Sequence, residues 1–247
     1  MRRMVGVIAL TLLLSIFCSA AVLAANPDAA ILLVNLNNKT QAGQSLAGHL
    51  LEPAGYTNVT EVNDPVDFVF EWESRADYDV IIISYHGIKD SVELQDWIKG
   101  EGKTIQAWVK AGGALISTAG RDAEEGGLCT LFGLFYVATG MIQDLVLVVD
   151  PVFAEGIEEG ILDSCDGPDP TPWNGDMYVG PLPSWTEYIV TTNLEGNTTM
   201  VAGSYGKGSL VLGGFEFNNL DTGGENQEEG FYGFPTFWKN LMDWVTS

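Results

Sequence analysis

The chain has 247 residues, of which 33 are Asp or Glu and 11 are Lys or Arg, so its formal net charge is −22. This balance excludes a nucleic-acid binder, because a surface that binds a duplex must replace phosphate counterions with Lys and Arg. With 46% hydrophobic and 18% charged residues, the sequence describes a globular protein with a core and excludes a disordered acidic tail.

The N-terminus has the order of residues that is typical of a secretory signal peptide. Arg2 and Arg3 precede an apolar run over Val5–Phe17, and small residues follow it. The run is shorter than the about 20 residues that a membrane-spanning helix needs. We therefore expect residues 1–24 to be a signal peptide and residues 25–247 to form one secreted or periplasmic domain, without membrane contact after cleavage. An uncleaved membrane anchor is the alternative.

The first half of the chain alternates short apolar runs with segments of helical spacing. Continuous apolar runs are typical of strands that are buried on both faces. In chain order we predict a strand over Ala29–Leu36, a helix over residues 41–53, a strand over Tyr56–Val62, a strand over Tyr78–Tyr85, one or two helices over Val92–Ala111 and a strand over Ala114–Thr118. This alternation indicates an α/β fold with a doubly wound, mostly parallel sheet flanked by helices.

The second half is less regular. We predict a strand over Leu145–Val149, a short helix over Pro151–Leu162, a long loop over Asp163–Pro183, strands over Glu187–Thr192, Thr198–Tyr205 and Gly208–Phe217, and a closing helix over Phe234–Val245. Gly206-Lys207 separates two of these strands by the length of a tight turn, which predicts a β-hairpin near the C-terminus. No linker indicates a second domain.

Several of these segments together resemble a known family. They are Ile105–Thr118, Tyr78–Ile83, Leu128–Leu134, Tyr205–Gly213 and Phe237–Val245. In this order and spacing they resemble class I glutamine amidotransferase-like proteins, especially the trehalose-utilisation (ThuA-like) branch. The resemblance covers roughly residues 29–247 and implies a flavodoxin-like, glutamine amidotransferase-like α/β domain.

The catalytic groups of that family are absent from the matching positions. The family uses a Cys at the turn that follows the central strand, where this chain has Thr118 or Ala119. The His and Glu that follow the last long strand are replaced by Phe217 and Asn219. Cys129 lies in an apolar segment and is no substitute, so we do not expect glutamine hydrolysis by the family's mechanism.

Other polar residues follow the predicted central strands. His86, Arg121, Asp122 and Glu216 each come shortly after the carboxyl end of a strand, where open α/β sheets gather ligand-binding groups. These four residues are candidate catalytic residues, and their cleft would bind a small polar ligand or a sugar. The alternative is structural: His86 caps a loop and Arg121 pairs with a neighbouring acid.

Metal and disulfide sites are also open questions. Asp163, Asp166, Asp169 and Asp221 lie in two acidic loops and could hold calcium, although neither loop has EF-hand spacing. Solvated carboxylates without an ion are the alternative, and no other cofactor is expected. Cys129 and Cys165 remain after signal cleavage and form either one disulfide or two separate thiols.

Two functions follow from these observations. The first is a non-catalytic glutamine amidotransferase-like domain that acts as a binding or interaction module for a carbohydrate or for another envelope protein. The second is a ThuA-like, sugar-directed hydrolase or isomerase that uses the His, Arg and carboxylate groups named above.

Overall fold

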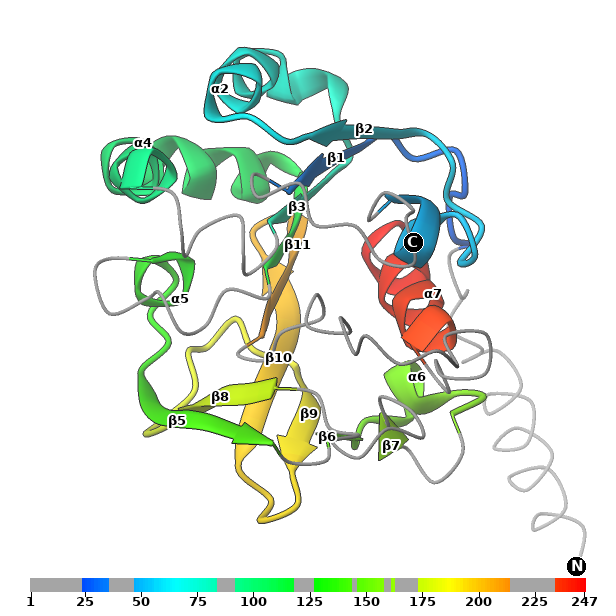
Figure 1. The fold of residues 1–247 in the computed structure, drawn as a ribbon, viewed down its shortest axis with the longest axis vertical. Helices are drawn as coiled ribbons and strands as arrows, with labels where there is room; N and C mark the ends of the chain where they lie inside the picture. The colour runs from blue at the N-terminus through cyan, green and yellow to red at the C-terminus, as the bar shows by residue number, and fades with distance from the viewer. Residues whose placement is uncertain are drawn as a thin grey trace, which may run out of the picture.

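The computed structural model describes residues 24–35, 47–83, 92–117, 127–143, 146–157, 161–162, 173–213 and 234–247. Its main element is a nine-stranded sheet with the strand order β2-β1-β3-β4-β11-β10-β9-β6-β7 (Figure 1). The strands are β1 (Ile31–Val34), β2 (Val59–Val62), β3 (Val80–Ile83), β4 (Ala114–Ser117), β6 (Val146–Val148), β7 (Ile161–Leu162), β9 (Tyr188–Asn193), β10 (Thr198–Tyr205) and β11 (Gly208–Gly213). β5 (Tyr136–Gln143) and β8 (Trp173–Tyr178) form a separate antiparallel pair.

The sheet has a parallel part and an antiparallel part. The five strands from β2 to β11 in the sheet order run parallel to one another, whereas each pairing from β11 onward to β7 is antiparallel. The predicted hairpin is present, because β10 and β11 pair across Gly206-Lys207. The α/β class expected from the sequence is therefore confirmed.

Helices cover both faces of this sheet. α2 (Pro65–Glu73), α4 (Val92–Ala111) and the short α5 (Leu128–Leu131) lie on one face, and α7 (Phe234–Val245), α6 (Pro151–Ala154) and the π-helical turn η1 (Ala47–Leu51) lie on the other (Figure 1). A 3-10 turn, η2 (Arg75–Asp77), follows α2. Within the sheet, successive residues of β1 alternate between the two cores: Ile31 and Leu33 face α7, and Leu32 and Val34 face α4. Both cores are apolar, which explains the uninterrupted apolar runs of the central strands.

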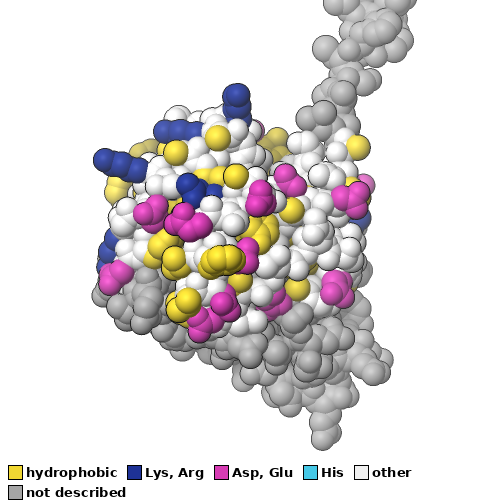
Figure 2. All heavy atoms as spheres, turned by 90° about the horizontal axis from the view of Figure 1, so that it is seen from above, with side chains coloured by type: hydrophobic (Ala, Val, Ile, Leu, Met, Phe, Trp, Pro, Cys, Tyr) yellow, Lys and Arg dark blue, Asp and Glu magenta, His cyan; other side chains and the backbone are white. Residues whose placement is uncertain are grey.

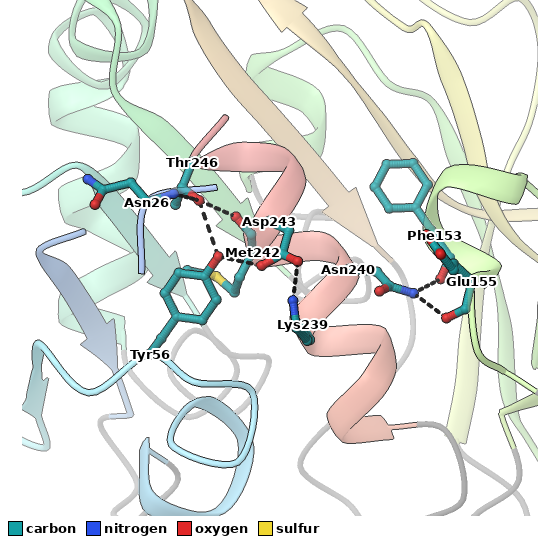
Figure 3. A network of polar contacts seen from close by, with 9 residues as sticks. All are labelled: Asn26, Tyr56, Phe153, Glu155, Lys239, Asn240, Met242, Asp243 and Thr246. Atoms are coloured by element: carbon teal, nitrogen blue, oxygen red, sulfur yellow. Dashed lines mark hydrogen bonds and ion pairs between the residues drawn. The ribbon is translucent and has the colours of Figure 1, made fainter. Parts of the chain in front are cut away.

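The C-terminal helix closes the face opposite α4. The hydroxyl of Tyr56 donates to Asp243 Oδ1 at 2.8 Å and lies 3.2 Å from Thr246 Oγ1, and the backbone N–H of Asn26 also donates to Thr246 Oγ1 (Figure 3). At the other side of the helix, Asn240 Nδ2 donates to the carbonyls of Phe153 and Glu155. These bonds attach α7 to three separate parts of the chain.

Two predictions for the second half are wrong. The predicted loop over 163–183 contains β8, which pairs with β5 in the register Tyr136↔Tyr178. The predicted helix over 151–162 ends at Ala154, and β7 occupies its last two residues. Both errors arise because strand pairing between distant segments decides these elements, and local spacing does not contain that information.

Candidate functional site: the carboxyl edge of the parallel strands

The carboxyl ends of the parallel strands form one level edge. The register pairs Val34 with Val62 and with Ile83, Ile83 with Ser117, and Ser117 with Leu212. Residues at the ends of five neighbouring strands therefore form one row across the sheet. β2 lies on one side of β1 and β3 lies on the other, so the strand order reverses at β1. Open α/β sheets bind ligands outside the carboxyl ends of the strands at such a reversal.

A polar contact that the sequence analysis missed lies at this edge. Asn35 directly follows β1 and is fully buried, and its Nδ2 donates to Glu61 Oε1 at 2.7 Å. Glu61 Oε2 accepts the backbone N–H of Ala47 at 3.1 Å, at the start of η1. The Glu61 carboxylate thus links the ends of β1 and β2 to the start of η1. The sequence did contain a signal for this contact, because the polar residue Asn35 directly follows the buried apolar strand Ile31–Val34.

The four candidate catalytic residues all lie outside the described residues. The structure does place the strand residues from which their segments leave: Ile83 is three residues before His86, Ser117 is four residues before Arg121, and Gly213 is three residues before Glu216. These three strands are direct neighbours in the order β3-β4-β11. The segments that carry His86, Arg121, Asp122 and Glu216 therefore all begin at the same edge of the sheet, and the convergence of these four side chains stays a prediction.

Neither Ser117 nor Cys129 has the setting of an exposed nucleophile. Ser117 is the last residue of β4 and is 2% exposed. Cys129 is also 2% exposed, and its Sγ lies 3.4 Å from the hydroxyl of Tyr178 within the core on the α4 face. The predicted partner Cys165 lies outside the described residues, so the disulfide remains a prediction.

The calcium prediction falls on undescribed residues as well. Asp163, Asp166, Asp169 and Asp221 are all outside the described ranges. Within those ranges, no three His, Cys, Asp or Glu side chains are close enough together to share a metal ion. No helix within the described ranges is both long enough and apolar enough to cross a membrane.

Aromatic side chains near the loop after β8 serve packing. Trp185 is partly buried against the core on the α4 face, and its Nε1 donates to the carbonyl of Phe132 at 2.9 Å. Trp185 therefore anchors the loop that follows β8. Trp173 is part of β8.

Comparisons with known proteins identify the fold alone. No family model and no curated protein matches the sequence. Among solved structures, the chain is similar to the cytoplasmic protein STM3548 from Salmonella typhimurium, with 13% identity, a TM-score of 0.53, and coverage of 87% of this chain and 98% of that one. It is similarly close to the cytoplasmic protein STM1381 from Salmonella typhimurium LT2, with 14% identity, a TM-score of 0.54, and coverage of 88% and 100%.

These neighbours correct the predicted location. The N-terminal pattern predicted a secreted or periplasmic protein, whereas both of these similar structures are of cytoplasmic proteins. The prediction of export is contradicted by this comparison. Its physical basis was an apolar run of a length that signal-peptide cores share with buried helices, so the run alone does not specify a compartment. Residues 1–23, which carry that run, lie outside the described residues.

Proposed function

We propose that this protein is a non-catalytic domain of the glutamine amidotransferase-like type that binds a small polar ligand, such as a sugar, at the carboxyl edge of its parallel strands. The observation that supports the proposal is the level row of strand ends, because the segments that carry His86, Arg121 and Glu216 leave from neighbouring strands of this row. The segment after β4 begins Thr118-Ala119 and supplies no Cys where the resembling family has its nucleophile.

The polar groups of these segments suit recognition of hydroxyl-rich ligands. An Arg guanidinium offers several N–H donors, and carboxylates accept hydrogen bonds from sugar hydroxyls. The hydrogen bonds of Asn35 and Glu61 hold the ends of β1 and β2 in place at this edge, which would stabilise the strands next to such a site.

The test is ligand binding by the full chain and by two variants. Calorimetric titration with trehalose, glucose, maltose and glutamine should give binding of at least one sugar. We expect His86→Ala and Arg121→Ala to weaken that binding about tenfold or more, since each removes hydrogen bonds to the ligand. Lys103→Ala, which changes an exposed side chain in the middle of α4 and not at the end of a strand, is the matched control and should bind as the unmodified protein does.

Two results would overturn the proposal. Unchanged sugar binding in both edge variants, or no binding of any of these ligands by the unmodified protein, would remove the carboxyl edge as a sugar site. Turnover of a sugar or amide that is lost in His86→Ala, with the fold intact by circular dichroism, would instead establish the alternative of a sugar-directed hydrolase or isomerase.

A further inference from the structure

The inner side of α2 is held firmly on the sheet. Phe68 and Trp72 are buried, and the ring of Trp97 from α4 lies 4.7 Å from each of them in an edge-on arrangement. Glu71 accepts a hydrogen bond of 2.5 Å from the hydroxyl of Tyr78, which precedes β3. These contacts fix the position of α2, so the backbone that carries the side chains on its outer side is also fixed.

The outer side of the same helix is also apolar. Val66 is 75% exposed, Phe70 is 70% exposed and Val69 is 46% exposed. Their spacing of i, i+3 and i+4 places all three on one face of the helix, opposite Phe68 and Trp72. We call Val66, Val69 and Phe70 the α2 outer face. A fixed, contiguous apolar face of this kind is typical of a surface that binds another protein.

The charges around the α2 outer face are acidic. Asp67 lies beside Val66, and Glu73 lies one helical turn beyond Val69 and Phe70. Neither α2 nor its N-cap residue Asp64 contributes a Lys or Arg. The next basic residue, Arg75, has its guanidinium 4.9 Å from the centre of the Trp72 ring, so it belongs to the inner contacts of the helix. Figure 2, seen from the side of α2, shows hydrophobic side chains with acidic ones among and around them, and Lys or Arg side chains on the same face of the molecule.

We propose that the α2 outer face binds a basic amphipathic segment of another protein. Apolar side chains of the partner would cover Val66, Val69 and Phe70, and its Lys or Arg side chains would lie near Asp67 and Glu73. A second copy of this chain fits less well, because a two-fold contact would bring identical acidic rims together between molecules that each carry a net charge of −22. The same charge disfavours an anionic lipid surface.

The experiment measures binding of a defined probe to the full chain. The probe is a fluorescent amphipathic helical peptide of Leu and Lys, compared with a peptide of the same pattern in which Glu replaces Lys. Fluorescence anisotropy should show binding of the Leu/Lys peptide and at least about tenfold weaker binding of the Leu/Glu peptide. Val66→Ser with Phe70→Ser should weaken binding of the Leu/Lys peptide about tenfold, because two apolar anchors are lost.

Two further variants separate apolar contact from charge. Val152→Ser with Leu194→Ser changes two other exposed aliphatic residues and should leave binding unchanged. Asp67→Asn with Glu73→Gln keeps the α2 outer face intact, and we expect it to weaken binding severalfold and to reduce its dependence on salt.

Three results would overturn the proposal. The first is equal binding of the Leu/Lys peptide to the unmodified protein and to the Val66→Ser, Phe70→Ser variant, which would show attraction by net charge alone. The second is binding of the Leu/Glu peptide to the unmodified protein with the same affinity as the Leu/Lys peptide. The third is a dimer of the unmodified protein, seen by light scattering, that becomes monomeric in the same variant, which would make a second copy the occupant.

Discussion

Gly203 lies in β10 at a point where another part of the backbone approaches closely. A Cβ atom at this position would lie 1.9 Å from the carbonyl oxygen of Trp185 and 2.8 Å from the backbone nitrogen of Glu187. These are backbone atoms, so they cannot turn aside as a flexible side chain would. We expect Gly203→Ala to lower the free energy of unfolding by about 2 to 3 kcal/mol. Urea unfolding followed by tryptophan fluorescence measures this change.

Gly100 provides the matched control for the same substitution. It lies in the middle of α4, and a Cβ there would meet no atom within 4 Å. Since Gly is a poor helix former, Gly100→Ala should raise the free energy of unfolding by about 1 kcal/mol. A loss of stability in both variants would show that the close approach at Gly203 is not the cause of its effect.

Glu61 is the second residue whose role can be tested alone. Its two carboxylate oxygens accept from Asn35 Nδ2 and from the N–H of Ala47. Glu61→Ala removes both acceptors and should lower the free energy of unfolding by about 2 kcal/mol. Glu61→Gln keeps one oxygen and should cost less. Equal losses in the two variants, measured by urea unfolding, would contradict this role.

At the scale of elements, the contact between Tyr56 and α7 predicts a specific pH dependence. Burial raises the pKa of the Tyr56 hydroxyl above its usual value, and the Asp243 carboxylate beside it raises the pKa further. Below about pH 10 the hydroxyl is protonated in both the folded and the unfolded chain, and its hydrogen bonds stabilise the fold fully. Above that pH the unfolded chain releases the proton first, so this contribution falls as the pH rises.

Tyr56→Phe tests this expectation. The variant lacks the hydroxyl and should be less stable than the unmodified protein by about 1 kcal/mol near neutral pH. Because only the unmodified protein loses the contribution of Tyr56, the difference between the two should narrow above about pH 10. Thermal unfolding of both proteins at a series of pH values measures this difference in stability. A difference that stays constant into that alkaline range would mean that the hydroxyl titrates alike in both states.

Elements with a strong local pattern were predictable, and elements that depend on distant partners were not. β3 was predictable because Val80–Ile83 are continuously apolar, and α4 because its apolar residues recur at helical spacing until Gly112-Gly113. α2 was not predicted from the sequence, because its outer face is apolar too and obscures the helical spacing of its buried residues. Its N-terminal signal was present: Asp64 Oδ1 accepts the N–H of Val66, and Pro65 follows the cap.

At the scale of the whole molecule, the sheet order decides how much of the candidate site was predictable. Alternating strands and helices indicated a parallel sheet, and the structure adds that β3, β4 and β11 are neighbours. The pairing of β11 with β4, in addition to its hairpin partner β10, joins segments that lie far apart in the chain, so no local pattern specified it. The contact of Asn35 with Glu61 was hidden for the same reason, since it requires β1 and β2 to lie side by side.

The charge of the whole molecule leads to a prediction about salt. With a net charge of −22, carboxylates repel one another over the folded surface, and this repulsion opposes the compact state. The ion pairs of the described chain, Lys99 with Asp96 and Lys239 with Asp243, lie at the surface and contribute little. Raising NaCl from about 20 mM to about 300 mM screens the repulsion and should raise the melting temperature by several degrees.

The pH dependence of that salt effect identifies its cause. Near about pH 5 a part of the carboxylates is protonated, the net charge is smaller, and the same addition of salt should raise the melting temperature less than it does near neutral pH. Calorimetric scans at the two pH values, each with low and high salt, give the comparison. A melting temperature that falls with salt near neutral pH would show that attractive pairs outweigh the repulsion among the acidic side chains.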